Sequence, residues 1–335
     1  MKNFTKLALV SSIAFSANAM AMQAMDDAAL SSTTGQDGIN IGIGISKVEI
    51  EKLFIHDNDG LATDKGGTGE AGAISIKGNG KSVMVGGKET NVVKDKGIVI
   101  GANYGGGGAY LLTTGNLADL RIDTDAGTGT NGAFINIAAD VSGLDINIGE
   151  IGVTASNDVQ GAGATSIRRG GDNNNYNAIL SGLSLKTGKM TANIQLGAAP
   201  QGAMIKLSTT MIGGLEIQNL GILDASTKAG KGDGSSVADR AAGEIFIESI
   251  KVADANSTDL TINQNVRVYG KAGTNNGYIQ MVSNSGPIDN YVKGIHLGSR
   301  DAGSIGDIEV QGLQTYYSPA MGSYLPGSVI TISSK

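Results

Sequence analysis

The sequence AFINIAADVSGLDINIGEIGV, from Ala133 to Val153, sets the pattern for this chain, and AMIKLSTTMIGGLEIQNLGIL, from Ala203 to Leu223, repeats it. In both copies apolar residues recur at alternate positions, which is the period of a β-strand. Gly143 separates two such runs in the first copy and Gly213–Gly214 in the second. A glycine inside a strand pattern predicts a bend, a bulge or a close approach of two backbones. We therefore expect a repeated unit of two short strands around a glycine. A weaker third copy runs from Ala178 to Met190, with the same Gly-Leu-polar-Leu core at Gly182.

The composition favours an extended β protein. The 335 residues include 52 Gly but only 4 Pro, no Cys and no Trp, and 40% of the residues are hydrophobic. The glycines have no triplet period, so a collagen helix is excluded, and the patterned apolar residues argue against disorder. With a net charge of −6 and scattered basic residues, the sequence does not predict a nucleic-acid interface. The absence of Cys removes most kinds of structural zinc site.

The first 21 residues, MKNFTKLALVSSIAFSANAMA, resemble a secretory signal peptide, with Lys2 and Lys6 before a short apolar run and small residues after it. The apolar run is too short to cross a bilayer, which needs about 20 residues. We expect cleavage after Ala21. The chain has no Cys that could carry a lipid anchor at this point. An exported chain without Cys has no disulfides, so its stability must come from its core and from backbone ladders.

A different segment follows, over residues 22–38. Its apolar positions fit one face of a short helix, and Gly35 is a typical helix stop. The segment resembles the start of the FilA family, pilus-system proteins of Acinetobacter-type bacteria. The resemblance is carried by Met22, Met25, Asp26, Asp27, Leu30, Ser31, Thr34, Gly35, Gln36, Asp37 and Gly38. It covers about seventeen residues and implies an exported, Gram-negative component of a fimbria-like surface system, with no catalytic residues.

From residue 39 to 335 the sequence predicts one glycine-rich, all-β domain. Ile39 to Ile55 is the longest strand pattern, and its phase changes after Ser46–Lys47. We expect a strand pair over Ala109 to Asp123 and a final strand in GSVITISSK, residues 327–335. The polar tracts 158–177 and 228–243 are predicted loops that project from the same end. We predict an elongated two-sheet structure or a solenoid-like stack of hairpins. The alternatives are a compact jelly roll and a transmembrane barrel, and 5 Phe, 9 Tyr and no Trp are too few for the aromatic girdles of a barrel.

Few residues suggest chemistry. His56 and His296 are the only histidines, and each lone His is more typical of a satisfied surface or edge position than of a catalytic base. Asp57 and Asp59 resemble the start of a calcium loop, but position five is Leu61 and position twelve is Thr68, so an Asx turn is favoured. Arg168–Arg169 lies in a Gly/Asn-rich tract and indicates a solvated turn. We therefore predict no enzyme, no catalytic residue, no cofactor and no metal site.

The expected function is structural. Exposed sheet edges are templates for pairing with another chain, and both Ile39–Ile45 and 327–335 are candidate donated or accepting strands. We expect an exported component of a fimbria- or pilus-like appendage at the cell surface, with other subunits or assembly proteins as partners and no transmembrane segment in the mature chain. The alternative is a secreted or periplasmic module that binds a glycan or a protein. For that alternative, Tyr316–Tyr317 and Tyr324, near Pro319 and Pro326, are a candidate aromatic platform.

Overall fold

A computed structural model describes residues 38–80, 84–85, 88–89, 92–129, 132–232, 235–236, 238–273 and 276–333. The chain divides into two units, Met1–Ile39 and Asn40–Lys335. The predicted signal peptide (1–21) and the predicted helical arm (22–38), apart from Gly38, lie outside the described residues. The elements below belong to the second unit, except that β1 begins at Ile39.

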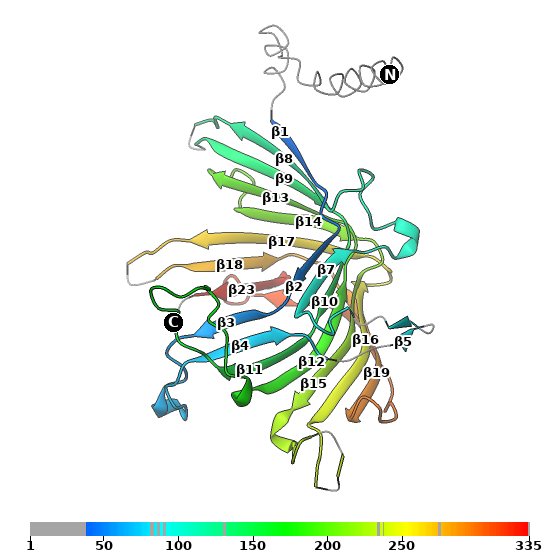
Figure 1. Cartoon of the computed structure of the whole chain (residues 1–335). Helices are drawn as coiled ribbons and strands as arrows, with labels where there is room; N and C mark the ends of the chain where they lie inside the picture. Colours follow the sequence, from blue (N-terminus) through cyan, green and yellow to red (C-terminus); the bar gives the residue numbers. More distant parts are fainter. Residues whose placement is uncertain are drawn as a thin grey trace, which may run out of the picture. The chain divides into compact units, whose positions relative to one another are not determined.

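Two large antiparallel sheets make up this unit, as the sequence predicts (Figure 1). Sheet A consists, in spatial order, of β1 (Ile39–Ile43), β8 (Ala118–Asp125), β9 (Phe134–Val141), β13 (Met190–Gly197), β14 (Ile205–Met211), β17 (Leu260–Tyr269), β18 (Tyr278–Ser283) and β23 (Ser328–Ile332). Sheet B consists of β2 (Lys47–Ile50), β7 (Ile98–Ala102), β10 (Leu144–Ile148), β12 (Asn177–Lys186), β15 (Leu215–Asp224), β16 (Gly243–Asp254), β19 (Ile288–Gly298) and β20 (Ile308–Leu313). It is extended by β3 (Leu53–Asp57), β4 (Gly72–Lys77) and β11 (Glu150–Ala155), where β11 pairs with β12 and β4. Two short hairpins are separate: β5 (Met84–Val85) with β6 (Lys88–Glu89), and β21 (Tyr316–Tyr317) with β22 (Leu325–Pro326).

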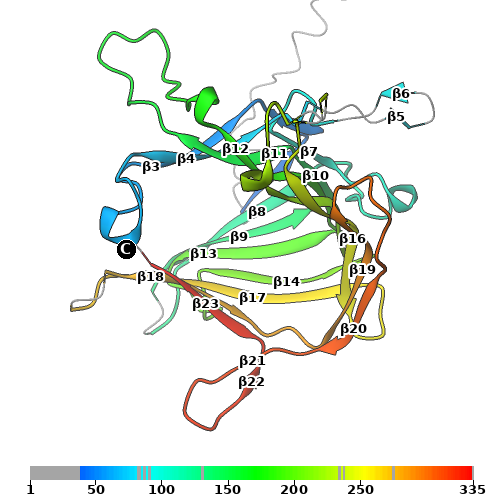
Figure 2. The same cartoon turned by 90° about the horizontal axis from the view of Figure 1, so that it is seen from below.

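The spatial order of sheet A matches that of sheet B, position by position. At the third position β9 continues into β10, at the fifth β14 continues into β15, and at the seventh β18 continues into β19. The unit is therefore a meander of eight positions. At six of them a short bend joins the two strands, whereas residues 103–117 join β7 to β8 and residues 314–327 join β20 to β23. Figure 2 shows the bend where β14 and β17 of sheet A meet β16 and β19 of sheet B.

Glycines occupy the bend because neighbouring backbones approach closely there. A Cβ on Gly143 would lie 2.6 Å from the Thr187 carbonyl oxygen. A Cβ on Gly188 would lie 2.7 Å from the Ile212 backbone nitrogen, and Gly214, with φ +73°, would place one 2.6 Å from the Val252 carbonyl oxygen. Only glycine fits such contacts without displacing a backbone. The predicted bends at Gly143 and Gly213–Gly214 are confirmed.

Buried polar side chains replace the ladder hydrogen bonds that the bend interrupts. Ser142 is fully buried; its hydroxyl donates to the Asn116 carbonyl (2.7 Å) and accepts from the Leu112 amide (3.0 Å). The Asn103 amide donates to the Thr187 carbonyl at 3.0 Å. Buried backbone groups need such partners, so these residues fix the path of each strand around the corner.

Aspartate side chains also accept hydrogen bonds from backbone amides at the bend, among its more carboxy-terminal strands. The Asp289 carboxylate accepts hydrogen bonds from the backbone amides of Asn256 (2.8 Å) and Gly312 (2.7 Å). These two bonds stabilise the charged form, and they lower the pKa of Asp289 below its ordinary value. The Asp259 carboxylate likewise accepts from the Gly213 amide at 2.8 Å.

A second line of irregular backbone crosses sheet B. Gly182, Asn219 and Gly294 have positive φ on β12, β15 and β19. The pairing of β12 with β15 shifts around Gly182, which marks a β-bulge. The apolar positions step by three residues at this line, from Leu180 to Leu183, so the alternation changes phase. Gly182 therefore has a different role from Gly143. Gly143 lies at the bend, whereas Gly182 lies at a bulge within β12, and the bend after β12 lies at Gly188.

Two further predictions about segments have different outcomes. The tracts 158–177 and 228–243 do lie at one end of sheet B, because the start of β12 pairs with the end of β15 (Leu180 with Ile222). The predicted strand pair over Ala109–Asp123 is wrong, since only β8 is a strand there. Residues 109–117 turn over the bend instead, where the Tyr110 carbonyl accepts from the Gly143 amide at 2.6 Å. The apolar side chains of residues 109–117 pack at the bend, and their spacing in the sequence resembles that of a strand.

Candidate interaction surfaces

The sheets of the second unit are open, and the strands at their edges are exposed. In sheet A the two edge strands are β1 and β23, and in sheet B they include β2 and β20. Four of the five residues of β1 and four of the five of β23 are exposed. The two candidate strands predicted from the sequence, within Ile39–Ile45 and 327–335, are therefore the two opposite edges of one sheet.

The two edges run in opposite directions. The meander has eight positions, and consecutive positions are antiparallel, so the first strand runs from sheet A to sheet B and the last from sheet B to sheet A. A second copy in the same orientation would place its first strand antiparallel to the last strand of the first copy. The hydrogen-bonding pattern of both sheets can thus continue from one copy to the next.

Continuous rows of apolar side chains cross sheet B from β2 to β20 and sheet A from β8 to the edge strand β23. In sheet A the paired residues of one row are Ile122, Ile137, Ile194, Ile205, Val266, Met281 and Ile330. In sheet B they are Val48, Ile100, Ile146, Leu185, Ile217, Ile250, Val292 and Ile308. We call these rows the aliphatic ladders. A hollow of about 270 Å³ at the bend is lined by Val252 of sheet B and Ile262 of sheet A, which are in phase with the ladders, so both ladders face the inside of the bend.

Burial on this inner side falls with distance from the bend. Met211 and Leu260, at the bend, are 2% and 7% exposed. Val268 and Ile332, at the far end of sheet A, are 59% and 54% exposed. The rows far from the bend are therefore only partly covered by the described part of the chain. Exposed apolar rows of this length are typical of a surface that another molecule covers.

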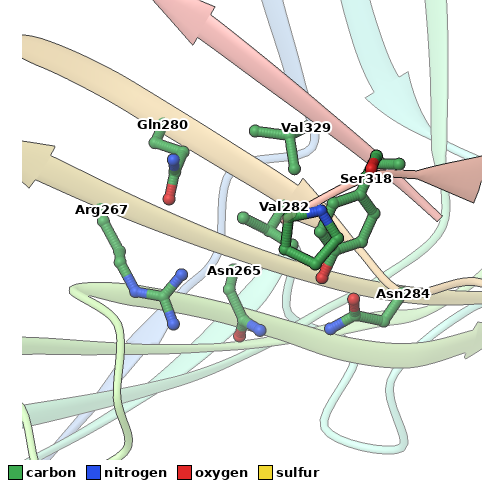
Figure 3. A pocket seen from close by; sticks show the side chains of 9 residues that line it. Asn265, Arg267, Gln280, Val282, Asn284, Ser318 and Val329 are labelled. Carbon is green, nitrogen blue, oxygen red and sulfur yellow. The ribbon is translucent and has the colours of Figure 1, made fainter. Parts of the chain in front are cut away.

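The opposite face of sheet A holds a polar hollow of about 450 Å³ (Figure 3). β17 contributes Asn265 and Arg267, β18 contributes Gln280, and Asn284 follows β18. Tyr317 of β21 and Pro319, which follows β21, line one side of the hollow. Figure 3 shows the side chains of Arg267, Asn265 and Asn284 following one another along the hollow.

The predicted aromatic platform is not assembled as expected. Tyr316 and Tyr324 are 59% and 73% exposed, whereas Tyr317 is half-buried and lines the hollow. Among the described residues, ring contacts join Phe54 to His56, Phe246 to His296 and Tyr269 to Tyr278, and none joins the three tyrosines of the predicted platform. Sequence analysis did not single out the side-chain amides on β17 and β18. Polar residues that alternate with Ile262 and Val266 are the usual pattern of a strand with one solvent-exposed face.

The two histidines fix loops to the outer face of sheet B. His56 Nδ1 lies 2.6 Å from the Ser156 hydroxyl, and burial, followed by the charge of Arg169, lowers the pKa of His56. His296 is 12% exposed; its Nδ1 lies 2.5 Å from the Ala302 carbonyl and its Nε2 3.3 Å from a Glu248 oxygen. Each histidine thus ties a connecting loop to a strand. The expectation that the chain is not an enzyme stays a prediction.

An ion pair between a buried glutamate and an arginine that is 29% exposed anchors the loop after β19. Glu244 is 7% exposed, and its carboxylate lies 2.7 Å from the Arg300 guanidinium. The Ser181 hydroxyl donates to the same carboxylate (2.6 Å) and accepts from Arg300 (2.7 Å). The guanidinium also lies 4.6 Å from the centre of the Phe246 ring. This cluster joins three segments of sheet B.

The remaining candidates are turns. The Asp59 amide donates to the Asp57 carboxylate at 3.4 Å, an Asx-type turn, and Arg169 donates to the Asn58 side chain at 2.6 Å. Arg168 pairs with Glu51 at 3.4 Å on the surface. In the part of the chain that the structure describes, no three His, Cys, Asp or Glu side chains are grouped to hold a metal ion. Calcium binding at Asp57 and Asp59 is therefore not assigned.

Comparison with known proteins gives no function. Residues 1–103 match the model of a family of unknown function, DUF6160, a match that ends just after β7 and covers less than half of the chain. No curated protein and no solved structure matches the chain. Within the described residues, no helix has the length and apolar character that a bilayer crossing requires. The resemblance to FilA-type proteins stays a prediction.

Proposed function

We propose that this protein is an exported, non-catalytic subunit of a fimbria- or pilus-like appendage at the cell surface. Copies of the chain assemble head to tail by strand pairing. The last strand of one copy, β20 with β23, pairs with the first strand, β1 with β2, of the next. Its partners are therefore other copies of itself, together with the proteins that export and assemble them.

The observation that carries this proposal is the pair of complementary edges. The first and last strands of the meander are different strands with opposite directions, so their contact is heterologous and does not close after two copies. Contacts of this kind generate rings or open filaments. Assembly in this register extends the aliphatic ladder of sheet B, because Val48 on β2 and Ile308 on β20 stand at its two ends.

The edges of sheet A lack the features that prevent pairing, whereas the sheet B edges carry Lys47 and Glu49 on β2 and Glu309 on β20. Proteins protect edge strands with charged residues, prolines or covering segments. The sequences of β1, INIGI, and β23, SVITI, contain no charge and no proline. An exposed, uncharged edge is expected to aggregate unless it has an intended partner, and a second copy supplies one.

A lysine on the edge strand tests the proposal. Ile332 on β23 and Ile279 on β18 are paired residues of one row, 54% and 40% exposed. We expect Ile332→Lys to convert the assembled protein to monomers, because a charge on the edge opposes strand pairing. We expect Ile279→Lys, one strand from the edge, to leave assembly intact. Sedimentation and electron microscopy of the secreted protein measure both.

The outcomes of this test separate three arrangements. Loss of assembly in Ile332→Lys alone supports edge pairing. Loss in both variants would place the contact on the inner face of the sheet and contradict the proposal. Assembly that survives in both would also contradict it, provided that both variants are secreted at the parental level.

A further inference from the structure

The polar hollow on the outer face of sheet A is lined by side-chain amides that are accessible to a ligand. The side chains of Asn265, Gln280 and Asn284 make no hydrogen bond to the described part of the chain, although all three line the hollow. Each amide carries two donor hydrogens and an acceptor oxygen. A ligand that offers hydroxyl groups, which both donate and accept, matches such a lining.

The hollow also has one oriented positive charge. Arg267 Nε donates to the Gly202 carbonyl at 2.8 Å, and this bond holds one edge of the guanidinium. No Asp or Glu is among the described residues of the lining, and Lys206 lies beside Asn265 on the neighbouring strand. The other guanidinium nitrogens are therefore available to a carboxylate, which arginine binds through two parallel hydrogen bonds.

The rest of the lining is largely apolar. The Tyr317 ring and Pro319 close one side, while Val282, 8% exposed, forms part of the floor. Aromatic and proline rings pack against the C–H face of a sugar ring, and the polar groups bind its hydroxyls. Few other ligands combine an apolar face, a rim of hydroxyls and an anionic group within one ring.

We propose that this hollow binds a carboxylated sugar residue, of the uronic-acid type, within a surface or host glycan. The carboxylate pairs with Arg267, the hydroxyls bind the amides of Asn265, Gln280 and Asn284, and the ring packs on Tyr317. This site goes beyond the structural role proposed above. It lies on the face of sheet A opposite the aliphatic ladders, so strand pairing and glycan binding can be measured separately.

Titration calorimetry with the full secreted chain tests the proposal. The probes are an oligosaccharide that contains glucuronic acid and the same oligosaccharide with its carboxyl groups reduced to alcohols. We expect the acidic probe to bind about tenfold more tightly, since it alone forms charge-assisted bonds. Arg267→Gln is expected to remove this difference, and Tyr317→Ala to weaken both probes.

Tyr316→Ala is the matched control, because Tyr316 is adjacent in sequence and is not part of the lining. It is expected to bind as the parent does. Equal affinity for both probes would overturn the carboxylate assignment, and no binding of either probe would overturn the site. Unchanged binding in Tyr317→Ala would also contradict it. Circular dichroism of each variant establishes that it is folded. The same titration with Ile332→Lys, which is expected to be monomeric, measures binding in the absence of assembly.

Discussion

Replacing Gly188 with alanine is expected to lower the free energy of unfolding by about 3 kcal/mol, which is typical of a severe steric conflict in a packed interior. The new Cβ would lie 2.7 Å from the Ile212 nitrogen, 2.8 Å from the Ile212 oxygen and 3.0 Å from the Met211 carbonyl carbon. All three atoms belong to the backbone of the adjacent bend, so no side chain can move aside. Urea unfolding followed by circular dichroism measures the effect.

Gly286 supplies the control for this substitution. It lies in the bend between β18 and β19, and a Cβ added there meets no atom within 4 Å. Gly286→Ala should change the unfolding free energy by less than about 0.5 kcal/mol, as is usual for open positions. Equal losses in both variants would mean that glycine flexibility, rather than close backbone approach, shapes the bend.

Removing the Arg300 guanidinium is expected to cost about 3 kcal/mol of stability. Arg300→Met keeps much of the side-chain volume but takes the positive charge from the buried Glu244 carboxylate, and breaking a buried pair from one side is strongly destabilising. The loss comes from desolvation of the carboxylate, since Glu244 is 7% exposed. Thermal and urea unfolding of the variant measure it.

Arg168→Met is the matched comparison. Arg168 also pairs with a glutamate, Glu51, but these two side chains are 80% and 56% exposed. Exposed pairs contribute between about 0 and 1 kcal/mol, so we expect almost no change. If the two substitutions destabilise the protein equally, the account of Glu244 and Arg300 as a desolvated pair is wrong.

The sequence predicts the local pattern of this fold better than its assembly. Alternating apolar residues around Gly143 and Gly213–Gly214 predict strands joined by bends, because period and glycine position are local properties. The role of Gly188 is not visible in the sequence, since its need for a missing Cβ comes from Ile212, 24 positions away. The change of phase from Leu180 to Leu183 can be seen in the sequence, but there it resembles an irregular repeat. Only the structure shows that neighbouring strands have irregular backbone at the same level of the sheet.

The candidate surfaces were predictable to a similar degree. Uncharged alternation in 39–43 and 328–332 predicts strands that could pair, and the structure places both at edges. That they are opposite edges of the same sheet depends on the whole meander. The polar hollow was missed because Arg267 and Asn284 come together only when β17 and β18 pair and Tyr317 closes over them.

Thiol cross-linking between copies tests head-to-tail pairing most directly, because the chain has no native Cys. Asn40 on β1 and Thr331 on β23 are exposed positions on the two edges of sheet A. In the assembled protein, a chain with both Asn40→Cys and Thr331→Cys, treated with a cross-linker that spans neighbouring strand positions, should give a ladder of covalent multimers. Either substitution alone should give monomers, because β1 of one copy pairs with β23 of the next and a single variant has a thiol on only one of these two strands. Monomers from the double variant, or dimers from a single one, would contradict the account.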